Sequence, residues 1–279
     1  MKIGYLLIPM VAIFAAGLLF SVSSQAGIDP KTVAGMWLFD EDKGDETFDS
    51  SGNENNGKLM NGPKWVGGKF GNALTFNGSS TYVDCGNGEN LDITKEISVM
   101  AWVKFNGLDY KNSAGNLFTI AAKGYPDALA AHAGWWFSYD NRNNGQGFSY
   151  TCFGNKNGGW AGGGNSLGGT NYMFNEKDWY HLAFTVGKSI AKLYIDGTQL
   201  GPNKTFANLV LSDTGRNLFI GCADKMWYFN GIIDEFAIFN VELSDQDIKT
   251  IMDKGLGSIQ AAVDFSGKLV NTWSNIKTR

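Results

Sequence analysis

The sequence predicts an all-β protein, built as a sandwich of two antiparallel sheets with one short helix near the C-terminus. Short strand-like runs recur along the chain and are separated by turns rich in Gly, Asn and Asp, which is the pattern of β-sandwiches. Helix signals are rare. A length of 279 residues is also ordinary for a single large sandwich.

The run from Ile97 to Phe105 shows the strand period most clearly. Every second residue is apolar, and Met100 and Trp102 lie between them. Because successive side chains of a strand point to opposite faces, both faces of this strand are predicted to be partly apolar. Asp196 and Gly197, between two such runs, predict a tight hairpin turn.

One helix is predicted after Leu243. Ser244 can cap its first turn, with Asp247 at the third helical position, which is close to a capping box. Ile248 and Ile251 then form an apolar stripe, and Gly255 ends the helix.

The first 26 residues have the order of a secretory signal. Lys2 supplies a positive charge, an apolar run extends to Phe20, and Ser24-Gln25-Ala26 places small residues at the −3 and −1 positions of a cleavage site. The alternative is a retained anchor, although the run is near the lower length limit for a span. The chain is predicted to divide into a signal peptide (1–26), a sandwich domain (27–254) and a C-terminal tail (255–279).

Composition narrows the partners of the protein. We expect it to be secreted or at the cell surface, with no membrane span once the leader is removed. The formal net charge is −4, and a chain with few Lys or Arg clusters lacks the basic face that nucleic-acid binding needs. Aromatic residues make up 14% of the chain, which suits a large packed core and not a disordered chain.

Three cysteines, Cys85, Cys152 and Cys222, lie in or beside strand-like runs, and none has CxxC spacing. Their number is odd, so at least one thiol is free or pairs with another chain. We interpret them as small buried hydrophobes.

Several short patterns occur in a characteristic order: WLFDE at 37–41, DSSGN at 49–53, GKFGNAL at 68–74, SVMAWVK at 98–104, WYHLA at 179–183, LYIDG at 193–197 and GIIDEF at 231–236. With them the chain resembles the LamG-like domains of the concanavalin A-like lectin and glucanase superfamily, in its bacterial secreted branch. The resemblance extends from about Gly35 to Met252 and implies a jelly-roll topology. Four large rings within these patterns are predicted to fill the space between the sheets: Trp37, Trp102, Trp179 and Phe236.

The resembled superfamily contains glycosidases and lyases as well as binding domains. A retaining glycosidase needs two carboxylates about 5 Å apart. The closest match to the glucanase pattern Glu-x-Asp-x-x-Glu starts at Glu176 and Asp178, but His181 stands in place of the second Glu. HExxH is absent from the sequence. A GxSxG match at 164–168 lies in a low-complexity Gly-rich run, and a GxxxxGK match at 52–58 is followed by Leu59 where a phosphate-binding loop needs Ser or Thr. Neither match stands between a strand and a helix, the context that these motifs require. We therefore predict a binding module without catalytic residues, not an enzyme.

Ligand binding by such a module requires exposed aromatic rings with a few polar partners. Four residues are predicted to contact the ligand: Trp136, Asp140, Trp160 and Trp227. The ligand is expected to be a glycan or an extracellular protein. The alternative is a structural or assembly protein of an extracellular layer, in which the same rings would form subunit contacts.

A structural calcium ion is also predicted. Residues 40–57 are dense in the carboxylate and amide oxygens that Ca²⁺ prefers. The resemblance implies that the first and last strands pair, and that Asp234 stands where related sandwiches often bind calcium. The predicted ligands are Asp234, Asp40 and Asp49. A second site near Asp127 and Asp224 is less favoured, and solvated turn residues are the alternative for all of these.

Thermal melts with calcium and with EDTA test this metal. Calcium at a hundredfold excess over its dissociation constant is expected to stabilise the fold by about 2.7 kcal/mol, and EDTA should remove that gain. A melting temperature that responds neither to EDTA nor to Asp234→Asn would contradict the prediction.

Overall fold

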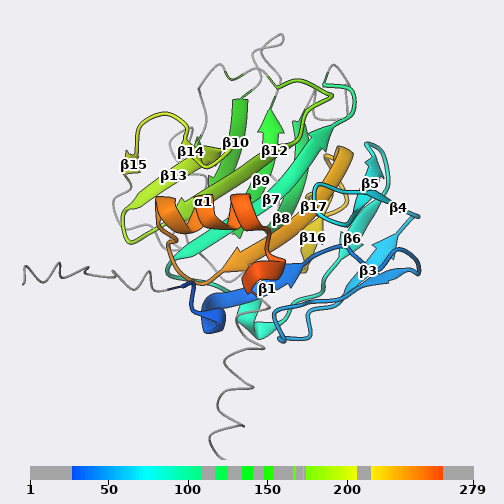
Figure 1. Cartoon of the computed structure of the whole chain (residues 1–279), viewed down its shortest axis with the longest axis horizontal. Coiled ribbons are helices and arrows are strands. Elements are labelled where there is room, and N and C mark those ends of the chain that lie inside the picture. Colours follow the sequence, from blue (N-terminus) through cyan, green and yellow to red (C-terminus); the bar gives the residue numbers. More distant parts are fainter. Residues whose placement is uncertain are drawn as a thin grey trace, which may run out of the picture.

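The structure is a computed structural model that describes residues 27–108, 117–124, 134–140, 148–153, 166–167, 172, 174–205 and 215–259. Two antiparallel sheets, here sheet A and sheet B, face each other with one α-helix on the outside (Figure 1). This confirms the predicted jelly-roll sandwich. The predicted signal peptide and residues 260–279 of the predicted tail lie outside the described residues. No helix of the described part is long and apolar enough to cross a membrane.

Sheet A has nine strands, in the order β14-β13-β12-β7-β17-β5-β4, with β1 also pairing with β17 and β15 with β13. Its strands are β1 (Val33–Trp37), β4 (Lys64–Gly67), β5 (Asn72–Asn77), β7 (Ile97–Phe105), β12 (Tyr180–Val186), β13 (Ile190–Ile195), β14 (Thr198–Gln199), β15 (Lys204–Thr205) and β17 (Asn230–Phe239).

Sheet B has eight strands, in the order β11-β10-β9-β8-β16-β6-β3-β2. Its strands are β2 (Glu46–Thr47), β3 (Gly57–Met60), β6 (Tyr82–Asp84), β8 (Leu117–Gly124), β9 (Gly134–Asp140), β10 (Phe148–Phe153), β11 (Ser166–Leu167) and β16 (Leu218–Ile220). Two short 3-10 turns, Pro30–Thr32 and Glu89–Leu91, complete the described elements.

The core between the sheets is dominated by aromatic rings. Trp37 and Phe236 are fully buried there, with ring centroids 5.7 Å apart, as predicted. The prediction is wrong for Trp102, which points to the outer face of sheet A. It lies two residues after Met100, which packs under the helix, and alternate residues of a strand share a face. Trp179 precedes β12 and is only half-buried.

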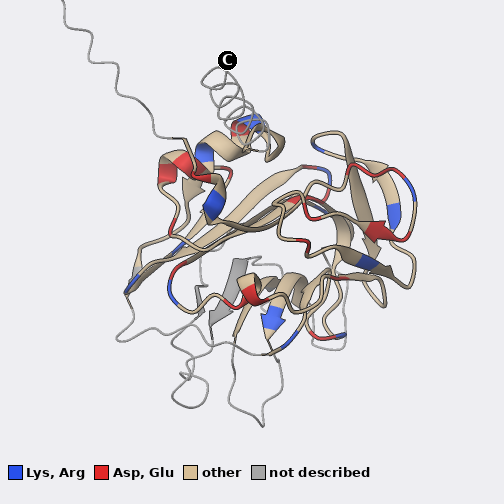
Figure 2. Cartoon of the chain, turned by 90° about the horizontal axis from the view of Figure 1, so that it is seen from below, with Lys and Arg blue, Asp and Glu red and all other residues tan. Residues whose placement is uncertain are grey.

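Helix α1 (Asp245–Lys254) lies on the outer face of sheet A, and Figure 2 shows the two sheets as layers with this helix outside. The predicted cap is present and complete: Ser244 accepts from the Asp247 N–H, and the Asp247 side chain accepts from the Ser244 N–H. Ile248 and Ile251 bury the apolar face of the helix against the sheet. A helix of this length depends on that packing for its stability.

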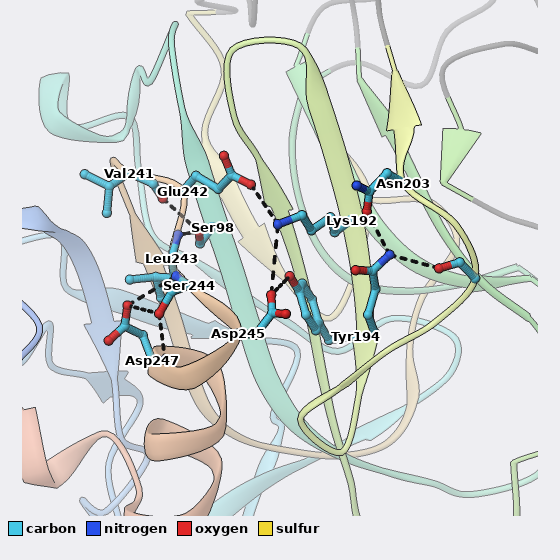
Figure 3. Close-up of polar contacts among 12 residues, drawn as sticks. Ser98, Lys192, Tyr194, Asn203, Val241, Glu242, Leu243, Ser244, Asp245 and Asp247 are labelled. Carbon is cyan, nitrogen blue, oxygen red and sulfur yellow. Dashed lines mark hydrogen bonds and ion pairs between the residues drawn. The ribbon is translucent and has the colours of Figure 1, made fainter. Parts of the chain in front are cut away.

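Polar contacts hold the start of α1 in place (Figure 3). The Tyr194 hydroxyl of β13 donates to Asp245 at 2.6 Å, and Lys192 pairs with Glu242 at 3.3 Å. In β7, Ser98 donates to the carbonyl of Val241 at 2.7 Å. These contacts fix the position of the helix along strands β7 and β13.

Strand β17 pairs with β7 along its length and shares its other edge between two strands. Residues 230–233 pair with β5, and residues 236–239 pair with β1. The pairing with β7 shifts register between Asp234 and Ala237, and Glu235 has a left-handed backbone (φ 48°). A β-bulge of this kind re-aims side chains locally.

The two residues of this bulge are buried carboxylates, and each binds a separate segment. Asp234 Oδ2 accepts from the backbone N–H groups of Lys69 and Phe70, at 2.7 and 2.9 Å. Glu235 Oε2 accepts from Leu256 N at 3.0 Å, just beyond α1. Burial raises the pKa of both Asp234 and Glu235 to about 7.

These raised pKa values predict a pH-dependent stability. Because the folded-state pKa of each carboxyl exceeds its unfolded value of about 4, the stabilising contribution is fully present below about pH 4. It is lost as pH rises to about 7, by up to about 1.4 kcal/mol per pH unit and per carboxyl. Asp234→Asn and Glu235→Gln should flatten the fall in melting temperature between pH 5 and pH 8.

The matched control is Asp45→Asn, since the Asp45 side chain is exposed. Melting curves of the four proteins across this pH range make the measurement. An equal pH slope in all four would show that the bulge carboxyls do not titrate in this range.

Candidate ligand-binding surface

Aromatic rings gather on the outer face of sheet B, and two of them, Trp227 and Tyr228, are partly exposed. We call this face the sheet B surface. Its side chains come from strands β3, β6, β8, β9 and β16 and from the segment between β16 and β17, and they form two neighbouring clusters. The first cluster consists of Trp136, Ala122, Ala223 and Trp227. The second cluster consists of Tyr82, Phe219, Cys222, Met60 and Tyr228. Strand alternation explains this face, because Trp135 and Phe137 of β9 point inward to the main core.

Trp136 and Trp227 form the first cluster. Their ring centroids are 5.6 Å apart in an edge-to-face arrangement. Trp136 lies on the outer face, but only 5% of it is exposed, because Trp227 packs against it. Trp227 itself is half-buried. Of these two predicted ligand contacts, Trp227 is the more exposed, and Trp136 packs beneath the Trp227 ring.

The segment that carries Trp227 is backbone-strained. Asp224, Lys225 and Trp227 all have positive φ, at 46°, 64° and 51°, a region that non-glycine residues rarely occupy. The turn is closed by backbone hydrogen bonds between Ala223 and Met226, and the Trp227 carbonyl accepts from Thr119 N at 3.0 Å. Such strain persists only where surrounding contacts hold it, and it concentrates at functional sites.

The second cluster is centred on Tyr82. Its ring lies 5.6 Å from Phe219 and 6.3 Å from Tyr228. Burial is the main cause that raises the pKa of Tyr82, and the nearby Cys222 adds to it. The Tyr82 hydroxyl is therefore neutral and can donate a hydrogen bond. Tyr228 is half-buried. These rings come from β6, β16 and the segment between β16 and β17. Alternation within one strand could not predict that they lie together.

Polar groups lie beside these rings. Asp84, at the end of β6, accepts from Asn217 Nδ2 at 2.9 Å. Arg216 and Asp224 approach to 3.9 Å across the same end of the sheet. Rings flanked by a carboxylate, an amide and a guanidinium are the combination that recognises the apolar face and the hydroxyls of a sugar. Of these polar residues, the sequence analysis named only Asp224, as part of the less favoured second calcium site.

Two predicted ligand residues cannot be assigned to this surface. Asp140 ends β9, where it pairs with Leu117 and Phe148, but its side chain is outside the described part. Trp160, like Asp127 of the less favoured calcium site, lies outside the described residues.

The three carboxylates predicted to bind calcium belong to two separate networks. Asp40 accepts from Asn72 N at 2.8 Å and Asp234 from Lys69 and Phe70, so both hold the same loop. Asp49 lies elsewhere, in the N-terminal loop.

Both oxygens of Asp49 accept hydrogen bonds. Its donors are the backbone N–H groups of Met36, Ser51 and Asn55 and the Asn55 amide, at 2.8–3.1 Å. Among the described residues no three His, Cys, Asp or Glu side chains gather closely enough to hold a metal ion. N–H groups occupy both oxygens of Asp49, which also lies in a different network from Asp40 and Asp234, so the three side chains do not meet at one point. Calcium binding stays a prediction.

The two cysteines whose side chains are described are small buried residues, as the sequence predicts. Cys85 and Cys222 are buried and free, and burial raises the pKa of the Cys222 thiol to about 12. Only the backbone of Cys152, within β10, is described.

The residues tested for catalysis have structural roles. Glu176 accepts from Leu108 N at 2.8 Å in the loop before β12. His181 is 1% exposed, and burial lowers its pKa to about 3, so the imidazole is neutral.

A two-sheet jelly roll with a helix on one sheet and aromatic residues on the other defines a lectin-like sandwich. Residues 77–249 match the family model of the concanavalin A-like lectin/glucanases superfamily, Laminin_G_3, and the chain belongs to that superfamily. No curated protein sequence matches the chain.

Solved structures share the fold at low identity. Domain 4 of AbnA, a GH43 extracellular arabinanase from Geobacillus stearothermophilus solved with arabinotriose, has a TM-score of 0.59 and 21% identity, over 79% of this chain and 98% of that one. The receptor-binding domain of botulinum neurotoxin C/D mosaic serotype has a TM-score of 0.57 and 17% identity, over 81% and 52%. The binding domain of botulinum neurotoxin DC in complex with SialylT has a TM-score of 0.58 and 14% identity, over 80% of this chain and 52% of that one. The chain spans about half the length of these toxin domains.

The packing of the two tryptophans gives opposite predictions for their removal. Trp136→Ala should cost about 3–5 kcal/mol of unfolding free energy, because it empties a buried site under Trp227. Trp227→Ala should cost less than half of that, since this ring is already partly in solvent. Chemical denaturation measures both, and equal losses would contradict the assigned layering.

Proposed function

We propose that the protein is a secreted, non-catalytic binding module that recognises glycans through the sheet B surface. The observation that carries the proposal is the pair of half-buried rings Trp227 and Tyr228, held by a strained segment beside Asp84 and Asn217. Preformed aromatic contacts with a few fixed polar groups are what sugar binding requires.

The relatives support a binding role in general. The similar domain of the arabinanase was solved with arabinotriose, and one similar toxin domain was solved with SialylT. At 14–21% identity these likenesses carry the fold alone, so the ligand of this chain rests on its own residues.

The arrangement of acidic residues supports a module without catalysis. Asp234 and Glu235 are the neighbouring carboxyls with strongly raised pKa, but they are 0% and 6% exposed. Each already holds backbone N–H groups. A glycosidase pair must instead flank the scissile bond of a bound substrate.

Assembly is the second candidate function. Met226, at the tip of the same segment, is 39% exposed, and an exposed apolar patch can also mark a protein interface. In that case the sheet B surface would meet a second chain, and no glycan would bind.

A glycan array followed by titration calorimetry tests the proposal. Trp227→Ala and Tyr228→Ala are each expected to weaken glycan binding at least about tenfold, or about 1.4 kcal/mol, while the protein stays folded. Phe48→Ala is the matched control: this ring is 55% exposed and belongs to neither cluster, and its loss should leave affinity unchanged.

Light scattering on a size-exclusion column separates the two functions. A monomer that binds glycans with the expected variant pattern supports the lectin role. A concentration-dependent oligomer that dissociates in Trp227→Ala and gives no array signal would replace it with assembly.

A further inference from the structure

A second aromatic and polar site lies on the outer face of sheet A, beyond the end of the helix. Three side chains stand side by side there, one on each of three neighbouring strands. Asp234 of β17 is the register partner of Trp102 of β7, and Trp102 is the register partner of His181 of β12. The Trp102 and His181 rings are 5.3 Å apart, edge to face. The row continues to Asp196, whose carboxylate accepts from His181 N at 2.9 Å.

The face of the Trp102 ring is occupied by an ammonium group of the protein itself. Lys69 Nζ lies 4.3 Å from the ring centroid, a cation–π geometry. Phe70 meets the same ring edge-on at 6.3 Å. The loop that carries both residues is held by Asp234 through its backbone, and not through the lysine side chain. Lys69 can therefore leave the ring while the loop stays attached.

The row also contains buried polar atoms that are left unpaired. Within the described part of the chain, Trp102 Nε1, His181 Nδ1 and Asp234 Oδ1 are buried and make no hydrogen bond of normal geometry. Buried polar atoms are nearly always paired, with protein or with another molecule, because each unpaired one costs about 1–3 kcal/mol. Trp102, His181 and Asp234 are 6%, 1% and 0% exposed. The row thus offers a donor, an acceptor and a neutral imidazole nitrogen at one place.

We propose that the outer face of sheet A holds an amino-sugar site, filled in this structure by Lys69 as an internal ligand. The ammonium of the sugar would take the place of Lys69 Nζ over Trp102, where the carboxylate of Asp196 also attracts it. Its hydroxyls would pair with the indole N–H and with His181 Nδ1. The site is separate from the sheet B surface, so either one can fail without the other.

The charge of the chain favours this ligand over a neutral sugar. The ring face already attracts a cation, and the positive charge of Lys69 acts on Asp196 to oppose the burial that raises the pKa of this carboxyl. The net charge of −4 adds a general attraction for cations. Lys69 competes with any external ammonium, and the apparent affinity falls by the fraction of time that the ring is free.

Titration of the folded protein with D-glucosamine hydrochloride tests the site. The readout is the indole N–H signal of Trp102 in ¹H–¹⁵N spectra, assigned by its loss in Trp102→Phe. In Lys69→Ala the ring is always free of the internal ammonium, so glucosamine should shift this signal with a Kd at least about tenfold lower than in the wild type. D-Glucose at the same concentration should leave the signal in place.

Lys104→Ala is the matched control, because it removes a positive charge from the same face of β7 without emptying the ring. It should behave as the wild type. Lys69→Ser repeats the test should Lys69→Ala fold poorly. The proposal is overturned by an unmoved Trp102 signal in both Lys69 variants, by equal affinities in the Lys69 variants and the wild type, or by equal responses to glucose. Methylammonium binding as tightly as glucosamine would also overturn it, since the sugar hydroxyls would then contribute nothing.

Discussion

The structure depends on the way strand β17 divides one of its edges between two partners. Its first half pairs with β5 and its second half with β1, while β7 pairs along the other edge. Neither strand pairs with residues 234 and 235, where the first partner ends and the second begins, and buried backbone groups at such a junction need other partners. Asp234 and Glu235, at the bulge between the two halves, supply acceptors for the loop at Lys69 and for the turn after α1. One dipeptide thus ties the N-terminal loops and the C-terminal helix to the centre of sheet A.

The two outer faces of the sandwich are covered by different parts of the chain. On sheet A the helix covers Met100, Ala183 and Tyr194, and the Lys69 loop covers Trp102. On sheet B no described helix lies over the rings, and the segment at Trp227 folds onto them instead. Sheet A is therefore the more covered of the two outer faces, and sheet B keeps partly exposed rings at Trp227 and Tyr228.

Local strain marks two of the places where the chain leaves regular pairing. Glu235 and Trp227 adopt left-handed backbone conformations that neither side chain favours. At Glu235 the strain is balanced by buried hydrogen bonds to the segment after α1. At Trp227 it is balanced by ring packing on Trp136 and by one backbone bond to Thr119. The second arrangement has fewer supports and lies nearer the solvent, so a ligand can add to it.

The sequence by itself determined the fold class, the alternation of the Ile97–Phe105 strand and the capped helix at Ser244, because each follows from periods and caps within a few residues. It also singled out Trp136 and Trp227 as candidate ligand contacts. Only the tertiary structure decided that Trp227 covers Trp136, that Tyr82 joins the same face, and that Trp102 lies outside the core under Lys69. Those contacts join strands distant in the chain, and local periodicity carries no information about which strand becomes the neighbour of which.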